Sequence, residues 1–363
     1  MTLRIALTAG GTGGHIFPAL AVLEALQQGG GIDEVRFFGP EDRGERARVE
    51  AHGLRFETVP AAAVRGRRPL SLAKSIIRLS AGTLTAVRKL RAFKPDVVFS
   101  TGGYASFPGS VAARLLRKPL VVYLPDVTPG WAVSAEQRLA TRVATTTEAA
   151  LAYLPRKKTV VTGYPVRPIF FDTSRDEARA KLNVPPGDRV VVVAGASQGA
   201  QALNRAVFEH IAALAKTAVV FHVTGERDAA RAQQLRADLG SLADRYRPAP
   251  FRDDLPLVML AADLAVMRAG ASVLGELPAA ALPSILIPGT FAGGHQRENA
   301  GWLADNGAAV VLEEADISEL PARIEALLED NSRLQSMRDA AKALARPDAA
   351  MSIANLVREV AKR

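Results

Sequence analysis

Glycine-rich turns at the ends of apolar runs are the residues of this chain best suited to chemistry. The first apolar run, 3–8, leads into Gly10-Gly11-Thr12-Gly13-Gly14-His15 and then into a segment of helical character. Such a turn presents unpaired backbone N–H groups, the positive end of a helix dipole and an imidazole at one point. It suits a phosphate, and Thr12 adds a hydroxyl donor. Because the spacing matches neither the dinucleotide-binding nor the P-loop pattern, a turn without a ligand stays an alternative.

The same arrangement occurs twice more along the chain. The apolar run 190–194 continues into Gly195-Ala196-Ser197-Gln198-Gly199-Ala200, and the run 97–100 continues into Thr101-Gly102-Gly103-Tyr104. Ligands of open α/β sheets bind at the carboxyl ends of the strands. We therefore expect ligand sites at two such edges, with a ligand held between two sheets.

Two later motifs carry polar side chains at the start of helical patterns. One is Arg268-Ala269-Gly270-Ala271-Ser272-Val273-Leu274-Gly275-Glu276, and the other contains Gln296 and Asn299. A carboxylate at the position of Glu276 can accept hydrogen bonds from the two hydroxyls of a ribose, or it can simply complement the helix dipole. Gln296 and Asn299 are about one helical turn apart, which places both on one face for a sugar or a base.

Alternating strand and helix patterns must position these loops. Apolar runs separated by helical patterns predict parallel sheets covered on both faces, and a turn-rich segment, 163–168, separates two series of runs. We expect a first Rossmann-like domain over 1–164, with 349–363 packing back on it, and a second over 165–348. The predicted strands are 3–8, 34–38, 96–100, 120–124, 143–146 and 159–162, then 189–194, 218–224, one ending near 251, 264–267, 284–287 and 308–312.

Charge is concentrated in one segment of the 363-residue chain. The formal net charge is +9, yet no acidic residue lies between Glu57 and Asp96, where nine cations alternate with apolar residues. This basic amphipathic segment, roughly 64–94, suits an anionic membrane surface. Nucleic-acid binding is disfavoured because only Phe93 could stack on a base. A solvated basic helix face stays the alternative.

Composition also limits the cellular setting. The chain has no cysteine, which excludes disulfides and thiolate chemistry, and no apolar stretch approaches the roughly 20 residues that span a bilayer. The sequence begins without the pattern of a secretory signal. We expect a cytoplasmic protein.

Six motifs, in order and in spacing, resemble those of the bacterial MurG family: 10–18, Gly102-Gly103-Tyr104 with Pro108-Gly109, Gly163-Tyr164-Pro165-Val166-Arg167, 195–200 with Asn204, 268–276, and Gln296 with Asn299. The resemblance implies a GT-B fold, in which two Rossmann-like, doubly wound domains face each other across a cleft. It implies inverting transfer of GlcNAc from UDP-GlcNAc to undecaprenyl-diphosphate-MurNAc-pentapeptide, which turns lipid I into lipid II in peptidoglycan synthesis. It further implies a peripheral position on the cytoplasmic face of the membrane, through a first domain that takes the lipid acceptor.

The resemblance also implies roles for individual residues. Glu276 would hold the ribose, and helix N-termini with Arg167 would offset the diphosphate charge, so that neither a metal nor another cofactor is expected. Acceptor-binding residues would be Gly102, Gly103 and Tyr104. Donor-binding residues would be Thr12, Gly13, Gly14, Arg167, Ser197, Gln198, Arg252, Ala271, Ser272, Val273, Leu274, Gly275, Glu276, Gln296 and Asn299.

One loop departs from the family pattern and keeps alternatives open. Where the family usually has His-Glu-Gln-Asn-Gly, this chain has Leu124-Pro125-Asp126-Val127-Thr128-Pro129-Gly130. Inverting transfer needs a base that takes the proton of the attacking hydroxyl, and His15 and Asp126 are the two candidates. The loop also leaves open a related GT-B transferase with another UDP-sugar or another polyprenyl or glycolipid acceptor. A UDP-GlcNAc 2-epimerase is a further alternative.

Overall fold

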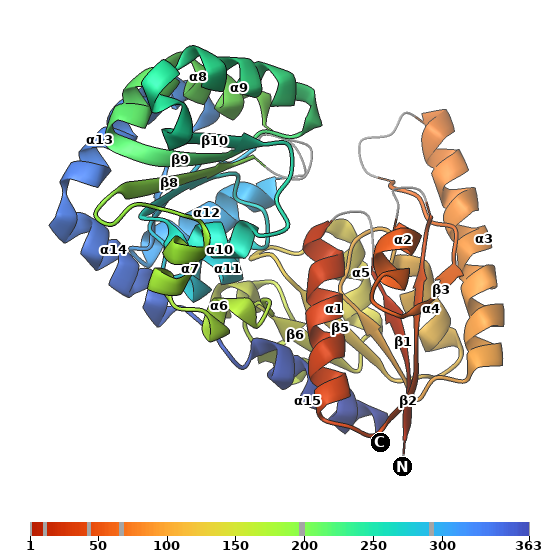
Figure 1. Ribbon diagram of the computed structural model, residues 1–363. Coiled ribbons are helices and arrows are strands. Elements are labelled where there is room, and N and C mark those ends of the chain that lie inside the picture. Colours follow the sequence, from red (N-terminus) through yellow and green to blue (C-terminus); the bar gives the residue numbers. More distant parts are fainter. Residues whose placement is uncertain are drawn as a thin grey trace. The chain divides into compact units, whose positions relative to one another are not determined.

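The computed structural model describes residues 2–9, 13–41, 45–64, 69–195, 200–289 and 294–362. The chain divides into two compact units. Unit 1 comprises Met1–Val166 and Asp348–Arg363, and unit 2 comprises Arg167–Pro347. Both consist of a parallel sheet with helices on its faces (Figure 1), so the predicted α/β class is confirmed.

The sheet of unit 1 has the order β3-β2-β1-β4-β5-β6-β7 within the described residues, and the neighbouring strands for which a register is defined run parallel. The central strands are uniformly apolar because helices cover both of their faces. The strands are β1 Leu3–Thr8, β2 Ile32–Gly39, β3 Arg55–Thr58, β4 Val97–Ser100, β5 Leu120–Leu124, β6 Arg142–Thr145 and β7 Thr159–Val161.

The helices of unit 1 form two layers. α3, α4 and α5 pack against one another, and their apolar side chains join those of β4 and β5 in one core cluster. α1 and α15 pack together, and Arg358 of α15 donates to the backbone carbonyl of Gly30 at 2.7 Å (Figure 1). The helices are α1 Gly13–Gln28, α2 Glu45–Glu50, α3 Pro69–Phe93, α4 Phe107–Leu115, α5 Trp131–Leu139 and α15 Ala349–Ala361.

Unit 2 repeats this plan with the strand order β10-β9-β8-β11-β12-β13 in its described part. α8 and α13 cover a core that includes Val191 and Val193 of β8, and α6, α7 and α10 pack together elsewhere in the unit. Its strands are β8 Arg189–Ala194, β9 Ala218–Val223, β10 Tyr246–Ala249, β11 Leu264–Met267, β12 Ser284–Leu286 and β13 Ala309–Val311. Its helices are α6 Ile169–Asp172, α7 Arg175–Lys181, α8 Gln201–Thr217, α9 Glu226–Asp238, α10 Leu255–Ala261, α11 Val273–Ala279, α12 His295–Asp305, α13 Leu320–Glu329 and α14 Asn331–Ala343.

The expected strands match the observed ones to within a few residues, but β3 was missed. Its sequence is Arg-Phe-Glu-Thr, and it lies at the edge of the sheet beside β2. An edge strand is covered less completely than a central one, so its sequence lacks the apolar run by which the other strands are recognised. No helix among the described residues is long and apolar enough to cross a membrane.

Candidate active site

The carboxyl edge of the unit 1 sheet brings together the start of α1 and the loop that follows β4. His15, in the first turn of α1, places Nδ1 2.8 Å from the backbone oxygen of Thr101. The Thr101 hydroxyl donates back to the carbonyl of His15 at 2.7 Å. Because a carbonyl oxygen only accepts, Nδ1 carries the proton of a neutral ring, and Nε2 is then the basic nitrogen.

Gly102 and Gly103 form the turn between β4 and α4, with φ values of 79° and 84°. Only glycine adopts such angles without strain. A Cβ on Gly102 would also lie 2.6 Å from Cγ2 of Val133 on α5. Tyr104 is half-buried and packs with a small apolar cluster that includes Trp131. The three residues expected to bind the acceptor therefore form one loop whose shape depends on its glycines.

A buried carboxyl group that sequence reasoning missed lies beneath this loop. Glu136 of α5 is fully buried and accepts hydrogen bonds from the hydroxyl of Ser100 at 2.9 Å, while its other oxygen lies 2.7 Å from Oγ of Ser106. Burial raises its pKa to about 7, although the hydroxyls of Ser106, Ser100 and Ser110 lower it. Serines at the end of β4 and the start of α4 are the signal in the sequence that could have indicated such a partner.

The loop that departs from the family pattern follows β5. Its Pro125 carbonyl accepts a hydrogen bond from the Thr146 hydroxyl at 2.8 Å, and Val127 is buried. Burial, and after it the charge of Asp126, raises the pKa of Tyr123 well above its usual value. Asp126 thus lies close enough to the buried Tyr123 to act on it electrostatically.

In unit 2, two residues expected to bind the donor contact each other. Arg167 places its guanidinium 4.0 Å from the carboxylate of Glu276 in α11, and it donates to the backbone oxygen of Asp253 at 3.3 Å. Burial raises the pKa of Glu276, and the charge of Arg167 partly offsets this rise. Ala271 and Ser272 form the turn before α11, and Val273, Leu274 and Gly275 are buried in its first turn.

Arg252 is held by a neighbour that was not predicted. Its guanidinium makes two hydrogen bonds to Asp254, at 2.8 and 2.6 Å, and stacks over the ring of Phe221 with its central carbon 5.1 Å from the centroid. The bidentate contact lowers the pKa of Asp254, which keeps that carboxylate ionised. The i, i+2 spacing of the two charges was the available signal.

The two amide side chains of α12 hold the backbone of neighbouring loops. Gln296 accepts from the N–H of Gly289 at 2.8 Å, and the fully buried Asn299 donates to the carbonyl of Ala269 at 3.1 Å. A third residue, Arg268, is buried, pairs with Glu314 and donates to the carbonyl of Ile287. These contacts fix the loops around Glu276.

A buried polar network lies at the start of α8. Asn204 donates to the carbonyl of Thr224 at 2.8 Å and to Asp228 at 2.7 Å, and its amide oxygen lies 3.0 Å from Nε2 of His222. Burial lowers the pKa of His222 to about 3, so this ring is neutral. Asn204 thus joins α8 to the end of β9.

Some predicted residues fall outside the described part of the chain. These are Thr12 in the first glycine loop, residues 65–68 of the basic segment, and Ser197 and Gln198 in the loop after β8. Gly13 and Gly14 begin α1. Within the described residues, no group of three or more His, Asp or Glu side chains is arranged to hold a metal ion.

Comparison with known proteins identifies the family. Residues 5–145 match the glycosyltransferase family 28 N-terminal domain, and residues 189–353 match the family 28 C-terminal domain. The chain is 38% identical over 365 residues to the UDP-N-acetylglucosamine–N-acetylmuramyl-(pentapeptide) pyrophosphoryl-undecaprenol N-acetylglucosamine transferase of Methylococcus capsulatus, covering 99% of each chain. The chain belongs to the MurG family.

Solved structures agree with this assignment. The crystal structure of Acinetobacter baumannii MurG matches 98% of this chain and 99% of its own, with 26% identity and a TM-score of 0.75. The UDP-GlcNAc 2-epimerase of Neisseria meningitidis covers 99% of the chain with a TM-score of 0.64, but at 15% identity it shares the fold alone. The MurG family and its GT-B fold, both expected from the motifs, are therefore confirmed.

Proposed function

We propose that this MurG family member transfers GlcNAc from UDP-GlcNAc to undecaprenyl-diphosphate-MurNAc-pentapeptide, which converts lipid I to lipid II in peptidoglycan synthesis. It is a UDP-GlcNAc-dependent glycosyltransferase. The observation that carries this conclusion is 38% identity over almost the full length of a transferase with that name. The chain shares its fold with a UDP-GlcNAc 2-epimerase, but the sequence identity is 15%, so the alternative of an epimerase has less support.

For the donor, we propose that unit 2 binds the UDP moiety. Arg167 and Arg252 would face the diphosphate, and the carboxylate of Glu276 would accept hydrogen bonds from the ribose hydroxyls. The contact between Arg167 and Glu276 supports this arrangement, because it brings a cation and a carboxylate together at the carboxyl edge of the sheet. Gln296 and Asn299 would contribute by holding the loops around Glu276.

For the transfer step, we propose that His15 takes the proton of the acceptor hydroxyl or orients that hydroxyl. The hydrogen bond from Nδ1 to Thr101 supports this role, since it leaves Nε2 as the basic nitrogen. Asp126 would supply the carboxylate of the loop after β5. Gly102, Gly103 and Tyr104 would contact the acceptor.

Release of UDP tests both the function and the base. Wild-type protein should release UDP from UDP-GlcNAc with lipid I faster than with other polyprenyl diphosphate sugars. His15→Ala should slow turnover by about 100-fold or more, the usual contribution of a general base. No UDP release with lipid I would overturn the acceptor assignment, and wild-type turnover in both His15→Ala and Asp126→Asn would overturn the proposed roles of these residues.

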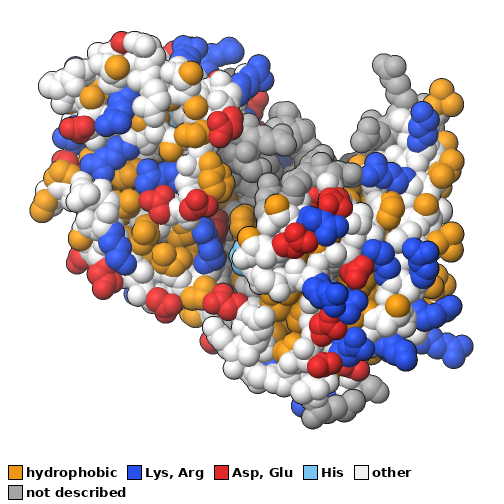
Figure 2. Space-filling model, turned by 45° about the vertical axis from the view of Figure 1, so that its right-hand side comes forward, with side chains coloured by type: hydrophobic (Ala, Val, Ile, Leu, Met, Phe, Trp, Pro, Cys, Tyr) orange, Lys and Arg blue, Asp and Glu red, His pale blue; other side chains and the backbone are white. Residues whose placement is uncertain are grey.

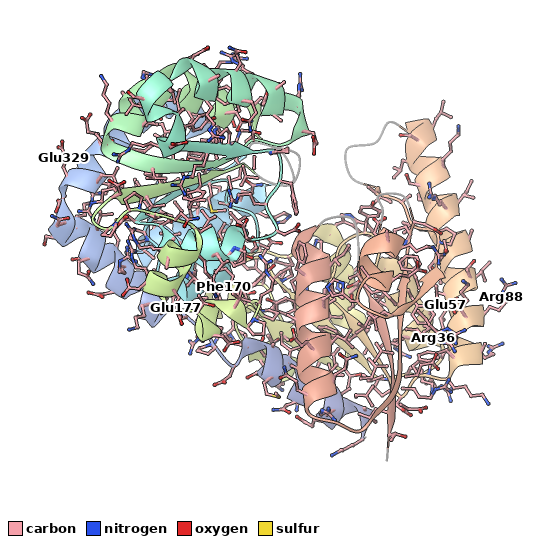
Figure 3. The ribbon with its side chains drawn as sticks, viewed as in Figure 1. Arg36, Glu57, Arg88, Phe170, Glu177 and Glu329 are labelled. Atoms are coloured by element: carbon pink, nitrogen blue, oxygen red, sulfur yellow. The ribbon has the colours of Figure 1, made fainter. Side chains whose placement is uncertain are left out.

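We propose further that unit 1 associates peripherally with the anionic cytoplasmic face of the membrane through 64–94. α3 exposes Leu70, Ile77 and Leu84, with exposed fractions of 84%, 69% and 73%, among exposed cations (Figure 2). Arg88 extends outward from α3, whereas Glu57 contacts Arg36 and Lys89 (Figure 3). An exposed surface that combines apolar and basic side chains fits the interface of an anionic bilayer.

Co-sedimentation with anionic vesicles tests the membrane surface. The combined changes Leu70→Ser, Ile77→Ser and Leu84→Ser should abolish binding, and neutralising Arg65, Arg67 and Arg68 should weaken it. Tyr153→Ser, which changes an exposed side chain on a loop of unit 1, is the matched control and should bind as the wild type does. Failure of the unchanged protein to bind anionic vesicles would overturn this part of the proposal.

A further inference from the structure

Glu136 lies outside the six motifs on which the resemblance to the family rests, and yet it connects to the loop proposed to receive the acceptor. It is fully buried on α5. One carboxyl oxygen accepts from Oγ of Ser100 at 2.9 Å, and the other lies 2.7 Å from Oγ of Ser106. A fully buried carboxyl group is rare in proteins unless specific partners compensate for its burial.

The two serines link this carboxyl group to consecutive glycines. The N–H of Gly102 donates to Oγ of Ser100 at 3.1 Å, and Oγ of Ser106 donates to the carbonyl oxygen of Gly103 at 2.8 Å. Ser106 is the N-cap residue of α4, but its side chain makes no capping hydrogen bond. A serine at this position usually caps its helix. The hydroxyl of Ser106 instead contacts the Gly103 carbonyl and Glu136.

The hydrogen-bond donors and acceptors around Ser106 bear on the charge of Glu136. The Ser106 hydroxyl has one proton and lies within hydrogen-bonding distance of two oxygens, the Gly103 carbonyl and Oε1 of Glu136. The Gly103 carbonyl can only accept, and it also accepts from the backbone N–H of Ser106 at 3.2 Å; the 2.8 Å contact with Oγ of Ser106 fits a hydroxyl proton that points to this carbonyl. With the hydroxyl proton in that position, the hydrogen bond between Ser106 and Glu136 needs a proton on the carboxyl group. A neutral Glu136 would accept from Ser100 and donate to Ser106. Each hydrogen bond in the chain that runs from the Gly102 N–H to the Gly103 carbonyl then has one donor and one acceptor.

We propose that Glu136 is a neutral carboxylic acid that positions the Gly102-Gly103 turn for the acceptor, and that its ionisation loosens that turn. The part of this proposal that concerns the acceptor rests on the proposed function, whereas the protonation state does not. Glu136 is a positioning residue, since it acts through Ser100 and Ser106. Ionisation would remove the donor to Ser106, so that the Glu136 carboxylate and the Gly103 carbonyl would compete for one hydroxyl proton.

The surroundings of Glu136 support a neutral group. The groups of the described residues that act on its carboxyl oxygens are hydroxyls: Ser100 on β4 and Ser106 before α4 lie at hydrogen-bonding distance, and Ser110 of the same helix has a smaller effect on the pKa. Burial is the largest influence on its pKa, and no charged side chain of the described ranges contributes to it. Its pKa of about 7 places the change of charge near neutral pH.

The substitution Glu136→Gln distinguishes the effect of ionising the carboxyl group from the effect of changing the packing around it. The Glu136→Gln side chain can donate to Ser106 and accept from Ser100 as the neutral acid does, but it cannot ionise. Glu136→Leu fills the space and removes both contacts. Because the leucine variant can fail to fold for reasons of packing, the glutamine variant and the unchanged protein carry the test.

Two readouts test the protonation state without any activity. An infrared difference spectrum between wild type and Glu136→Gln should contain the carbonyl stretch of a protonated carboxyl group below pH 7, and this band should disappear at higher pH. The pKa of Glu136 is higher in the folded protein than the value of 4.5 for an exposed glutamate. The folded wild type therefore binds more protons than the unfolded chain does in this range, and its thermal midpoint relative to Glu136→Gln should fall as pH rises from 4.5 through 7.

Kinetics test the positioning role. In wild type, the KM for lipid I should rise as pH increases through 7 while the KM for UDP-GlcNAc stays constant, and Glu136→Gln should lose this pH dependence. Glu136→Leu, which removes both contacts, should raise the KM for lipid I by at least about fivefold, the effect expected from one hydrogen bond.

The outcomes separate the two proposals. A carboxylate band in place of the carboxylic acid band below pH 7, or a Glu136→Gln thermal midpoint that follows the wild type at every pH, would overturn the neutral acid. A KM for lipid I that has the same pH dependence in wild type and in Glu136→Gln would overturn the positioning role. If lipid I supports no transfer at all, the proposed function fails, and the infrared and thermal measurements still decide the charge of Glu136.

Discussion

At the carboxyl edge of the unit 1 sheet, the loops are joined by hydroxyls, peptide groups, an imidazole and a buried carboxyl group. In unit 2, ion pairs act beside two amide side chains at the corresponding edge. In unit 1, His15 bonds to Thr101, and Glu136 connects to the glycine turn through two serines. In unit 2, Arg268 pairs with Glu314, and Arg252 pairs with Asp254. The two edges of a repeated fold therefore differ in the chemical type of their contacts, and ion pairs are the type that salt screens.

This difference fits the two substrates proposed for the units. Arg167 is 44% exposed, so an anionic diphosphate could approach it while replacing only a weak contact with Glu276. A carboxylate and a phosphate can each accept two hydrogen bonds from the planar guanidinium group of an arginine. Replacing the first by the second therefore changes the interaction free energy of the arginine little. The unit 1 edge instead offers oriented peptide groups, which suit the hydroxyls of a sugar.

The largest effect should come from breaking the ion pair between the buried Arg268 and the partly exposed Glu314 of unit 2. Arg268→Met leaves Glu314 without its partner and removes the donor to the Ile287 carbonyl. We expect the free energy of unfolding to fall by about 2–3 kcal/mol, measured by urea denaturation; the loss stays below that of a fully buried pair because solvent reaches Glu314. The control is Arg297→Met, which removes the exposed pair with Glu313 and should cost less than about 1 kcal/mol. Equal losses in the two variants would mean that burial does not distinguish these pairs.

A smaller effect is expected from the carboxylate proposed to hold the ribose. Glu276→Ala should weaken UDP binding by about 30-fold, since hydrogen bonds to a charged group contribute about 2 kcal/mol. Isothermal titration calorimetry with UDP measures this change. Glu329→Ala alters an exposed glutamate of α13 in the same unit and serves as the control (Figure 3). If the two variants bind UDP equally well, Glu276 has no role in donor binding.

At the unit 1 edge, the glycine turn allows a matched pair of alanine substitutions. Gly102 and Gly187 have similar φ values of 79° and 81°, but only the Cβ added at Gly102 would meet a neighbour, Val133 at 2.6 Å. Gly102→Ala should lower the free energy of unfolding by about 1–2 kcal/mol more than Gly187→Ala does, because overpacking adds to the shared backbone cost. Indistinguishable denaturation curves for the two variants would contradict the tight packing of this turn.

The smallest of the expected effects is that of salt concentration on the binding of UDP to unit 2. Raising the ionic strength from about 0.05 to about 0.5 M shortens the screening length several-fold and should weaken UDP binding by about two- to fivefold. Uridine lacks the diphosphate, so its binding should not change with salt. Equal salt dependence for UDP and uridine would argue against a contact between the diphosphate and Arg167 or Arg252.

Much of the fold could be predicted because its signals are local. Runs such as Val190-Val191-Val192-Val193 are recognisable as buried parallel strands from their composition alone, and glycines at their ends indicate where the chain turns. The edge strand β3 has no such run and was missed.

The sequence by itself determined the order of strands and helices, the glycine turns at the carboxyl ends of the strands and the motifs of the MurG family, because each depends on residues close together in the chain. Only the tertiary structure decided which side chains meet. Glu136 contacts serines 30 and 36 positions away, and Asn299 holds a carbonyl 30 positions before it. Hydrogen bonds over such separations depend on how helices pack on a sheet, and no periodicity within either segment encodes that packing.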